Sequence, residues 1–179
     1  MKLTPLLSLK LTKLTVLLML FLGIHFSANA QEDGPPPAIA PGLEISRTDL
    51  IKAITHIDSS LIFKKGPDLK GVSYYSATNT TQTEVRLVGS ESELKSVEWS
   101  LIYDKDPKVT RTKIDHVSDF MVIMGRAKGT KWLDKQLTII CKNLLKNFVS
   151  DKEMLDFNRK AQIIYKAKEQ MVTLIFVEW

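Results

Sequence analysis

The sequence contains a single cysteine among its 179 residues. One cysteine excludes a disulfide framework within the chain and any zinc or iron–sulfur site that needs several thiolates. Glycine and proline are also scarce, with 8 and 7 residues, which excludes collagen-like and low-complexity classes. What remains is a chain long enough for one ordinary domain and too short for two.

The sequence also lacks the short motifs that mark common enzymes. It has no G-x-S-x-G elbow, no P-loop and no G-x-G-x-x-G turn. The histidines beyond the N-terminal segment lie near carboxylates only as His56 with Asp58, and His116 with Asp115 and Asp119. Neighbouring residues on a helix diverge, whereas a metal needs three or four convergent ligands. We therefore predict no catalytic residue, no metal site and no cofactor.

Residues 1–30 have the three parts of a secretory signal peptide. Three lysines accompany an almost unbroken apolar run over residues 14–26, and Ala28 and Ala30 form an A-x-A cleavage pattern. The apolar core is short against the roughly 20 residues that span a bilayer. We therefore expect cleavage after Ala30, a secreted or periplasmic location, and no membrane span in the mature chain.

Removal of this segment changes the charge of the protein. The whole chain carries a formal charge of +5, and three of its 25 basic residues precede Gln31, so the mature charge is +2. A charge this small does not call for nucleic acid or an anionic membrane as partner. The basic residues are nevertheless unevenly spread: residues 126–168 carry +7 and residues 31–125 carry −3.

The next segment, residues 31–43, reads QEDGPPPAIAPGL. Four prolines and two glycines in thirteen residues do not suit a helix or a sheet interior, and predict a flexible leader. The folded domain is expected to span residues 44–179. Ser46 to Asp49 is a plausible helix start, because an oxygen side chain stands three residues ahead of an acidic one.

Two parts of this domain have the alternating pattern of half-buried strands. Residues 71–103 predict an antiparallel meander, and residues 162–177 predict a terminal hairpin whose last strand is apolar enough to be central. Helical patterns resume near Ser118, with Gly125 as a candidate helix end, and again from Thr130. Residues 150–153 resemble a capping box that would open a further short turn. The predicted fold is α+β, with an antiparallel sheet of about five strands and two or three helices on one face.

The helix predicted from Thr130 to Phe148 supplies the candidate binding residues. Leu133, Leu137, Ile140, Leu144 and Phe148 share one side of it, and are expected to be core. Trp132 and Ile139 lie together on its flank, either as packing residues or as anchors of an interface. Four lysines lie opposite the apolar side and are expected to reach solvent: Lys131, Lys135, Lys142 and Lys146.

Cys141 lies at the edge of the apolar side of that helix. It is either a reactive thiol or a small buried hydrophobic residue, and we favour burial because an exposed thiol is a liability outside the cytoplasm.

These observations favour an exported, non-catalytic binding domain whose ligand is unknown. A protein or an acidic polymer of the cell envelope would fit the basic stretch as partner, although a solvated lysine face is the commoner origin of such a stretch. Two alternatives remain open. One is a small secreted hydrolase that uses carboxylates between Asp104 and Asp119. The other is an inhibitor of another exported protein.

Overall fold

The computed structural model describes residues 42–156 and 158–179. The predicted signal peptide and residues 31–41 of the predicted leader lie outside this part of the chain. Leu43, which the sequence places at the end of the leader, is fully buried, and its amide donates to the carbonyl of Leu94 at 2.8 Å. Close packing of the described chain therefore starts at its first residues.

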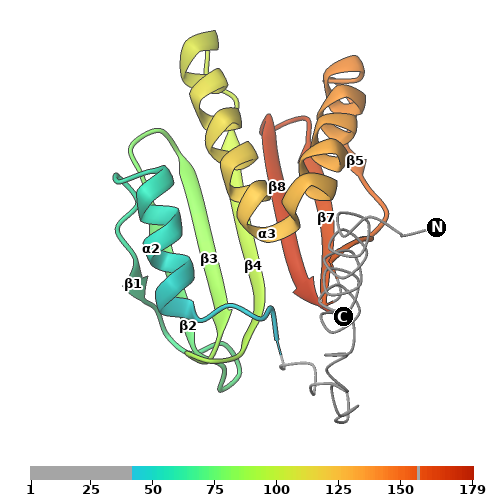
Figure 1. Ribbon diagram of the computed structural model, residues 1–179. Coiled ribbons are helices and arrows are strands. Elements are labelled where there is room, and N and C mark those ends of the chain that lie inside the picture. Colours follow the sequence, from blue (N-terminus) through green and yellow to red (C-terminus); the bar gives the residue numbers. More distant parts are fainter. Residues whose placement is uncertain (1–41, 157) are drawn as a thin grey trace, which may run out of the picture. The chain divides into compact units, whose positions relative to one another are not determined.

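The described residues form an eight-stranded antiparallel sheet with two helices, which confirms the predicted α+β class (Figure 1). The strand order is β1-β2-β3-β4-β8-β7-β5, and β6 also pairs with β7. The five long strands are β2 (Tyr74–Thr78), β3 (Thr83–Gly89), β4 (Leu94–Ile102), β7 (Arg159–Lys166) and β8 (Met171–Glu178). The strand number exceeds the predicted five because three short edge strands add to them: β1 (Lys64–Lys65), β5 (Phe148–Val149) and β6 (Glu153–Asp156).

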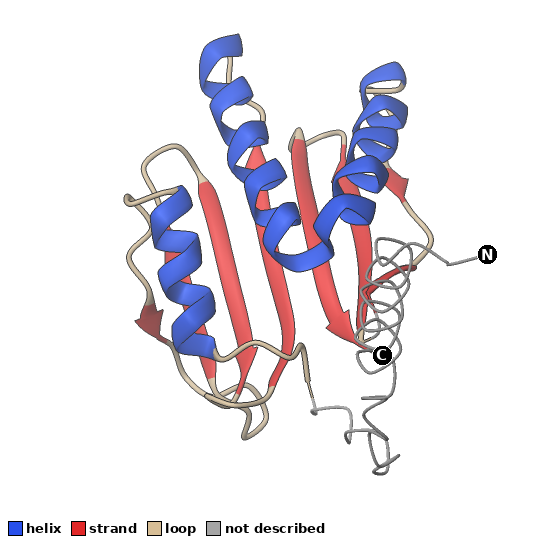
Figure 2. Cartoon of the chain, in the orientation of Figure 1, coloured by secondary structure: helices blue, strands red, loops and turns tan. Residues whose placement is uncertain are grey.

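Both helices cover the same face of the sheet (Figure 2). Buried and partly exposed residues alternate along β3, β4, β7 and β8, as expected for a sheet with one covered face. The aromatic centre of the core joins helix to sheet. The Phe120 ring lies 4.9 Å from the Trp99 ring and 5.7 Å from the Phe176 ring, measured between centroids. β8 lies between β4 and β7, so the last strand is central, as predicted.

Helix α2 (Arg47–Ile57) starts where the sequence predicts it. Ser46 is its N-cap, and the Ser46 side chain accepts a hydrogen bond from the Asp49 amide at 3.0 Å. Such a cap satisfies a backbone donor that has no partner within the helix. Leu50 and Ile54 lie four residues apart and are fully buried, so one face of the helix packs on the sheet.

Helix α3 (Pro107–Lys142) begins eleven residues before the predicted start at Ser118. Asp106 caps it by accepting from the Lys108 amide at 2.8 Å, and Pro107 occupies the first turn, where a missing N–H costs nothing. The polar first turns of α3 hide the helical pattern from sequence analysis, and the Asp106-Pro107 pair that starts the helix follows the end of β4 at Ile102 by four residues.

A break at Arg126 divides α3 into two arms, which diverge in Figure 1. Arg126 has φ 52° and ψ −153°, a backbone conformation that only glycine adopts without strain. The sequence placed a helix end at Gly125, and the break follows directly after that residue. The second arm then runs back beside β5 and β7.

The second arm ends at Lys142, six residues before the predicted end at Phe148. The prediction that Leu144 is core is therefore wrong: residues 143–146 form turns, and Leu144 is 44% exposed. Leu137 is partly buried against the core and Ile140 is buried. Residues 150–153 are also not helical, because they connect β5 to β6.

The end of α3 yields a paired test of packing. Truncation of the buried Ile140 to alanine should cost about 2–5 kcal/mol of unfolding free energy, because it leaves a cavity in the core. Leu144→Ala is the matched control, and should change the unfolding free energy by about 0.5 kcal/mol or less. Urea denaturation of both variants measures the difference, and equal losses would contradict the described helix end.

The break in α3 yields a second prediction. Arg126→Gly removes the β-carbon that is strained at positive φ, so it should leave stability unchanged or raise it, by about 1 kcal/mol at most. Both variants lose the Arg126 side-chain contact with Asp156, which spans 3.4 Å from Nε to Oδ2, and only Arg126→Ala keeps the strained β-carbon. The alanine variant should therefore be the less stable of the two in thermal unfolding, and the reverse order would show that residue 126 is unstrained.

Candidate functional site

A groove of about 550 Å³ lies between the second arm of α3 and the edge of the sheet. We call it the basic groove. The helix contributes Lys128, Lys131, Trp132, Lys135, Gln136 and Ile139, and the edge contributes Phe148, Val149, Ser150, Asp151 and Glu153. The groove therefore contains four of the six residues that the sequence proposed as a binding site.

The helical residues of the groove recur every three or four positions, so they share one face of the second arm. Trp132 is only 9% exposed and forms part of the core. Ile139 is half-buried, whereas Lys131 and Lys135 are exposed. The helix thus gives the groove an apolar floor and a basic rim, and Trp132 is both a packing residue and part of the lining.

The opposite wall is the interrupted edge next to β7. Phe148 and Val149 pair with Tyr165 and Ile164, and β6 pairs with β7 further along. Ser150 bridges the two short strands: its amide donates to the Ile163 carbonyl at 2.9 Å, and its hydroxyl accepts from the Ile163 amide at 3.0 Å. Ser150 therefore makes the hydrogen bonds to β7 at the point where the edge is irregular between β5 and β6.

The lysines of the groove differ in whether they have partners within the described chain. Lys128 donates to the carbonyl of Met154 and lies 3.4 Å from the Glu153 carboxylate. Within the described part of the chain, Lys131 and Lys135 form no ion pair. Asp151 lies on the opposite rim. One end of the groove is thus neutralised internally, and two lysines along its middle remain available to an anion.

The structure separates the other two predicted lysines from this groove. Lys142 lies on the far side of the second arm, in an open cleft between the two arms that Leu137 and Cys141 also line. Lys146 lies beyond the end of the helix and is exposed. The expectation that Cys141 is buried is wrong, because its side chain is exposed.

A polar centre that no sequence pattern predicts surrounds Asp58, the C-cap of α2. His116 of α3 places Nδ1 3.5 Å from Asp58 Oδ2, and the Asn79 amide group donates to that oxygen at 2.9 Å. The hydroxyl and amide of Ser60 both donate to Asp58 Oδ1. Local spacing groups His116 with Asp115 and Asp119, whereas its partner in the structure is Asp58, 58 positions away, so no local pattern indicates that contact.

Asp58 holds its charge although it is only 8% exposed. Burial acts to raise the pKa of its carboxyl, but the Ser60 hydrogen bonds, the nearby His116 and the Asn79 amide outweigh burial and hold that pKa below its ordinary value. Ser60 donates to Asp58 and not to His116, so the three residues do not form the nucleophile–base–acid order of a hydrolase. The centre ties α2, α3 and the β2–β3 turn together.

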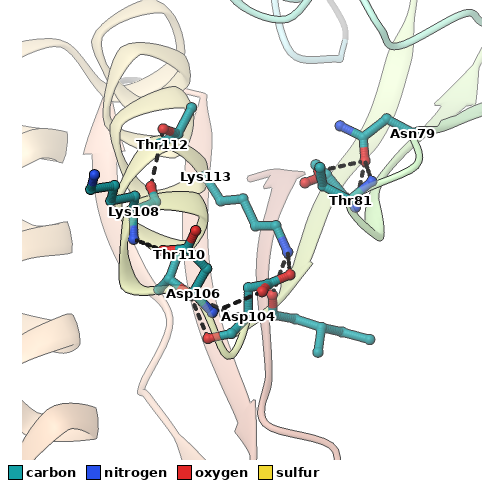
Figure 3. A network of polar contacts seen from close by, with 10 residues as sticks. Asn79, Thr81, Asp104, Asp106, Lys108, Thr110, Thr112 and Lys113 are labelled. Carbon is teal, nitrogen blue, oxygen red and sulfur yellow. Dashed lines mark hydrogen bonds and ion pairs between the residues drawn. The ribbon is translucent and has the colours of Figure 1, made fainter.

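The carboxylates between Asp104 and Asp119 mostly serve local structure. Figure 3 shows Lys113 reaching from α3 to Asp104, and its Nζ also donates to the Ile102 carbonyl at 2.8 Å. Burial lowers the pKa of Lys113, and Asp104 opposes this shift. Asp106 caps α3, and Asp115 accepts from Arg111 at 3.2 Å. These contacts give no support to a pair of carboxylates that act together on a substrate.

Within residues 42–156 and 158–179, no helix combines the length and hydropathy that a membrane crossing requires. The same residues include no cluster of three or more His, Cys, Asp or Glu side chains arranged to hold a metal ion. No known family model, curated protein or solved structure matches the chain.

The centre around Asp58 predicts a pH-dependent contribution to stability. The folded-state pKa of Asp58 lies below its unfolded value, so the contribution is present above about pH 4 and is lost as the pH falls through the folded pKa. Asp58→Asn should therefore cost about 1–3 kcal/mol near pH 7 and progressively less below about pH 4. Urea denaturation at several pH values measures the gap.

The exposed Asp119 supplies the control, since it lies on the same arm as His116. Asp119→Asn should change the unfolding free energy by about 0.5 kcal/mol or less across the same pH range. A loss for Asp58→Asn that stays constant from pH 7 to pH 2 would show that the ionised carboxylate is not what stabilises this centre.

Proposed function

We propose that the protein is an exported binding domain that catalyses no reaction, and that the basic groove takes an anionic partner. The observation that carries the proposal is the pairing of an apolar floor, built by Trp132 and Ile139, with two lysines that have no ion-pair partner in the described chain. Ligand sites commonly combine a mostly apolar concave lining with a few polar groups that orient the ligand.

The size of the groove suits a ligand and not a single ion. About 550 Å³ falls within the range of roughly 300–1,000 Å³ that small-molecule pockets occupy. Lys131 and Lys135 supply long-range attraction for an anion, and the half-buried Ile139 and Phe148 supply apolar contact once it arrives. Export rests on the signal-like N-terminal sequence, with residues 31–179 as the mature protein.

The lysines provide the direct test of this proposal. The probe is a short poly-glutamate chain, and binding is followed by isothermal titration calorimetry over a range of salt concentrations. Replacement of both Lys131 and Lys135 by glutamine should weaken binding about tenfold and flatten its salt dependence, because exposed charges act through screened attraction.

A second double variant controls for net charge. Lys95 and Lys166 are exposed and do not line the basic groove. Their replacement by glutamine removes the same charge and should leave poly-glutamate affinity within about twofold of the parent protein. If the two double variants weaken binding equally, overall charge accounts for the attraction and the basic groove is not the site.

A further inference from the structure

The edge that borders the basic groove has backbone groups that face away from the sheet. Residues of an antiparallel strand alternate between those that bond to the neighbouring strand and those that point the other way. The Ser150 amide bonds to β7, so Phe148 has the same orientation and Val149 the opposite one. The N–H and C=O of Val149 therefore point outward, and the Val149 side chain is 59% exposed.

The rest of this edge is already satisfied or irregular. The carbonyl of Met154 accepts from Lys128, and Ser150 fills the bulge between β5 and β6. Another strand could therefore pair here only over a short segment centred on Val149. Proteins commonly protect sheet edges from pairing by short strands, bulges and lysines. At Val149 none of these features blocks the backbone N–H and C=O.

The spacing of the lysines matches what such a strand would present to the helix. Lys131 and Lys135 are separated by one helical turn, about 6 Å along the axis. Side chains at alternate positions of an extended segment share one face and lie about 6.6–6.8 Å apart. A residue paired with Val149 through both its N–H and C=O would point its side chain to the open face of the sheet, so its two neighbours would point toward α3.

We propose that the basic groove binds an extended acidic peptide segment that adds to the sheet beside β5. The central residue of the segment pairs with Val149 and is apolar, and the residues on both sides of it carry carboxylates that meet Lys131 and Lys135. The inference rests on the proposed function, and adds to it the chemical class and the backbone conformation of the partner. The minimal recognised pattern is acidic–apolar–acidic.

Three capped nine-residue peptides test the pattern. Each contains two Glu and one Val, flanked by Gly and Ser. The first has the order Glu-Val-Glu, the second has Val-Glu-Glu, and the third repeats the first with the Val nitrogen methylated. Chemical-shift titration of the ¹⁵N-labelled protein gives the affinities. The second and third peptides should bind on the order of five- to tenfold more weakly, because one loses the alternation and the other the hydrogen bond to the Val149 carbonyl.

Variants at residue 149 test the same hydrogen bonds from the protein side. Val149→Pro removes an N–H that points away from β7, so it leaves the existing ladder intact. It should weaken binding of the first peptide on the order of five- to tenfold relative to Val149→Ala. Binding of inorganic polyphosphate, which needs no strand pairing, should be equal for the two variants.

The outcomes separate the inference from the proposed function. If the three peptides bind equally, or Val149→Pro binds like Val149→Ala, while the lysine double variant still weakens binding, strand addition is wrong and the anionic groove stands. If polyphosphate binds and no peptide does, the partner is a polyanion of another class, and the inference is again overturned. If neither the peptides nor polyphosphate respond to the lysine double variant, both the inference and the proposed function fail.

Discussion

The buried guanidinium of Arg159 holds the described fold in the arrangement that makes a groove possible. Its Nε donates to the Leu43 carbonyl at 2.8 Å, and its Nη1 donates to the Met124 carbonyl at 3.0 Å. The first contact fixes the start of the described chain, and the second satisfies a carbonyl in the last turn before the break at Arg126. Burial lowers the pKa of Arg159, and Asp156 and Glu44 oppose this shift. A buried cation is costly unless such partners surround it. Arg159 therefore holds α3, β7 and the segment at Leu43 in fixed positions relative to one another.

The same geometry explains why the groove lies where it does. Because α3 breaks after Gly125, its second arm lies over the β7 end of the sheet and turns a row of lysines toward the edge. The edge itself is uneven, since Ser150 interrupts β5 and β6 and its carbonyl accepts from the Gln162 side chain at 2.9 Å. A continuous helix would carry the lysines away from the sheet, and a continuous strand would leave no recess beside it.

Sequence patterns predicted the parts of this structure that depend on local periodicity. The alternation in the meander and in the terminal hairpin indicated strands because each has one buried face, and Ser46 indicated a helix start because a cap is a local contact. The misplaced boundaries of α3 have a different origin. Asp106 and Pro107 start a helix whose first turns are polar, so no apolar pattern marks its beginning. At the other end, apolar residues keep helical spacing as far as Leu144, although the helix ends at Lys142. The contact between His116 and Asp58, like the choice of which lysines share a groove, depends on tertiary packing and has no local signature.

The exposed lysines of the second arm of α3 have three different surroundings, although their helical spacing is similar. Lys128 satisfies the edge through Met154 and Glu153, Lys142 faces the cleft between the arms, and only Lys131 and Lys135 border the recess without an ion-pair partner in the described residues. Lys128 and the Ser150 bulge close most of the edge to pairing, and closure of this kind protects a sheet against aggregation. In the binding mode that we propose, an edge that leaves only Val149 open admits a short segment and the two lysines favour an acidic one, so the features that exclude other sheets would also select the partner.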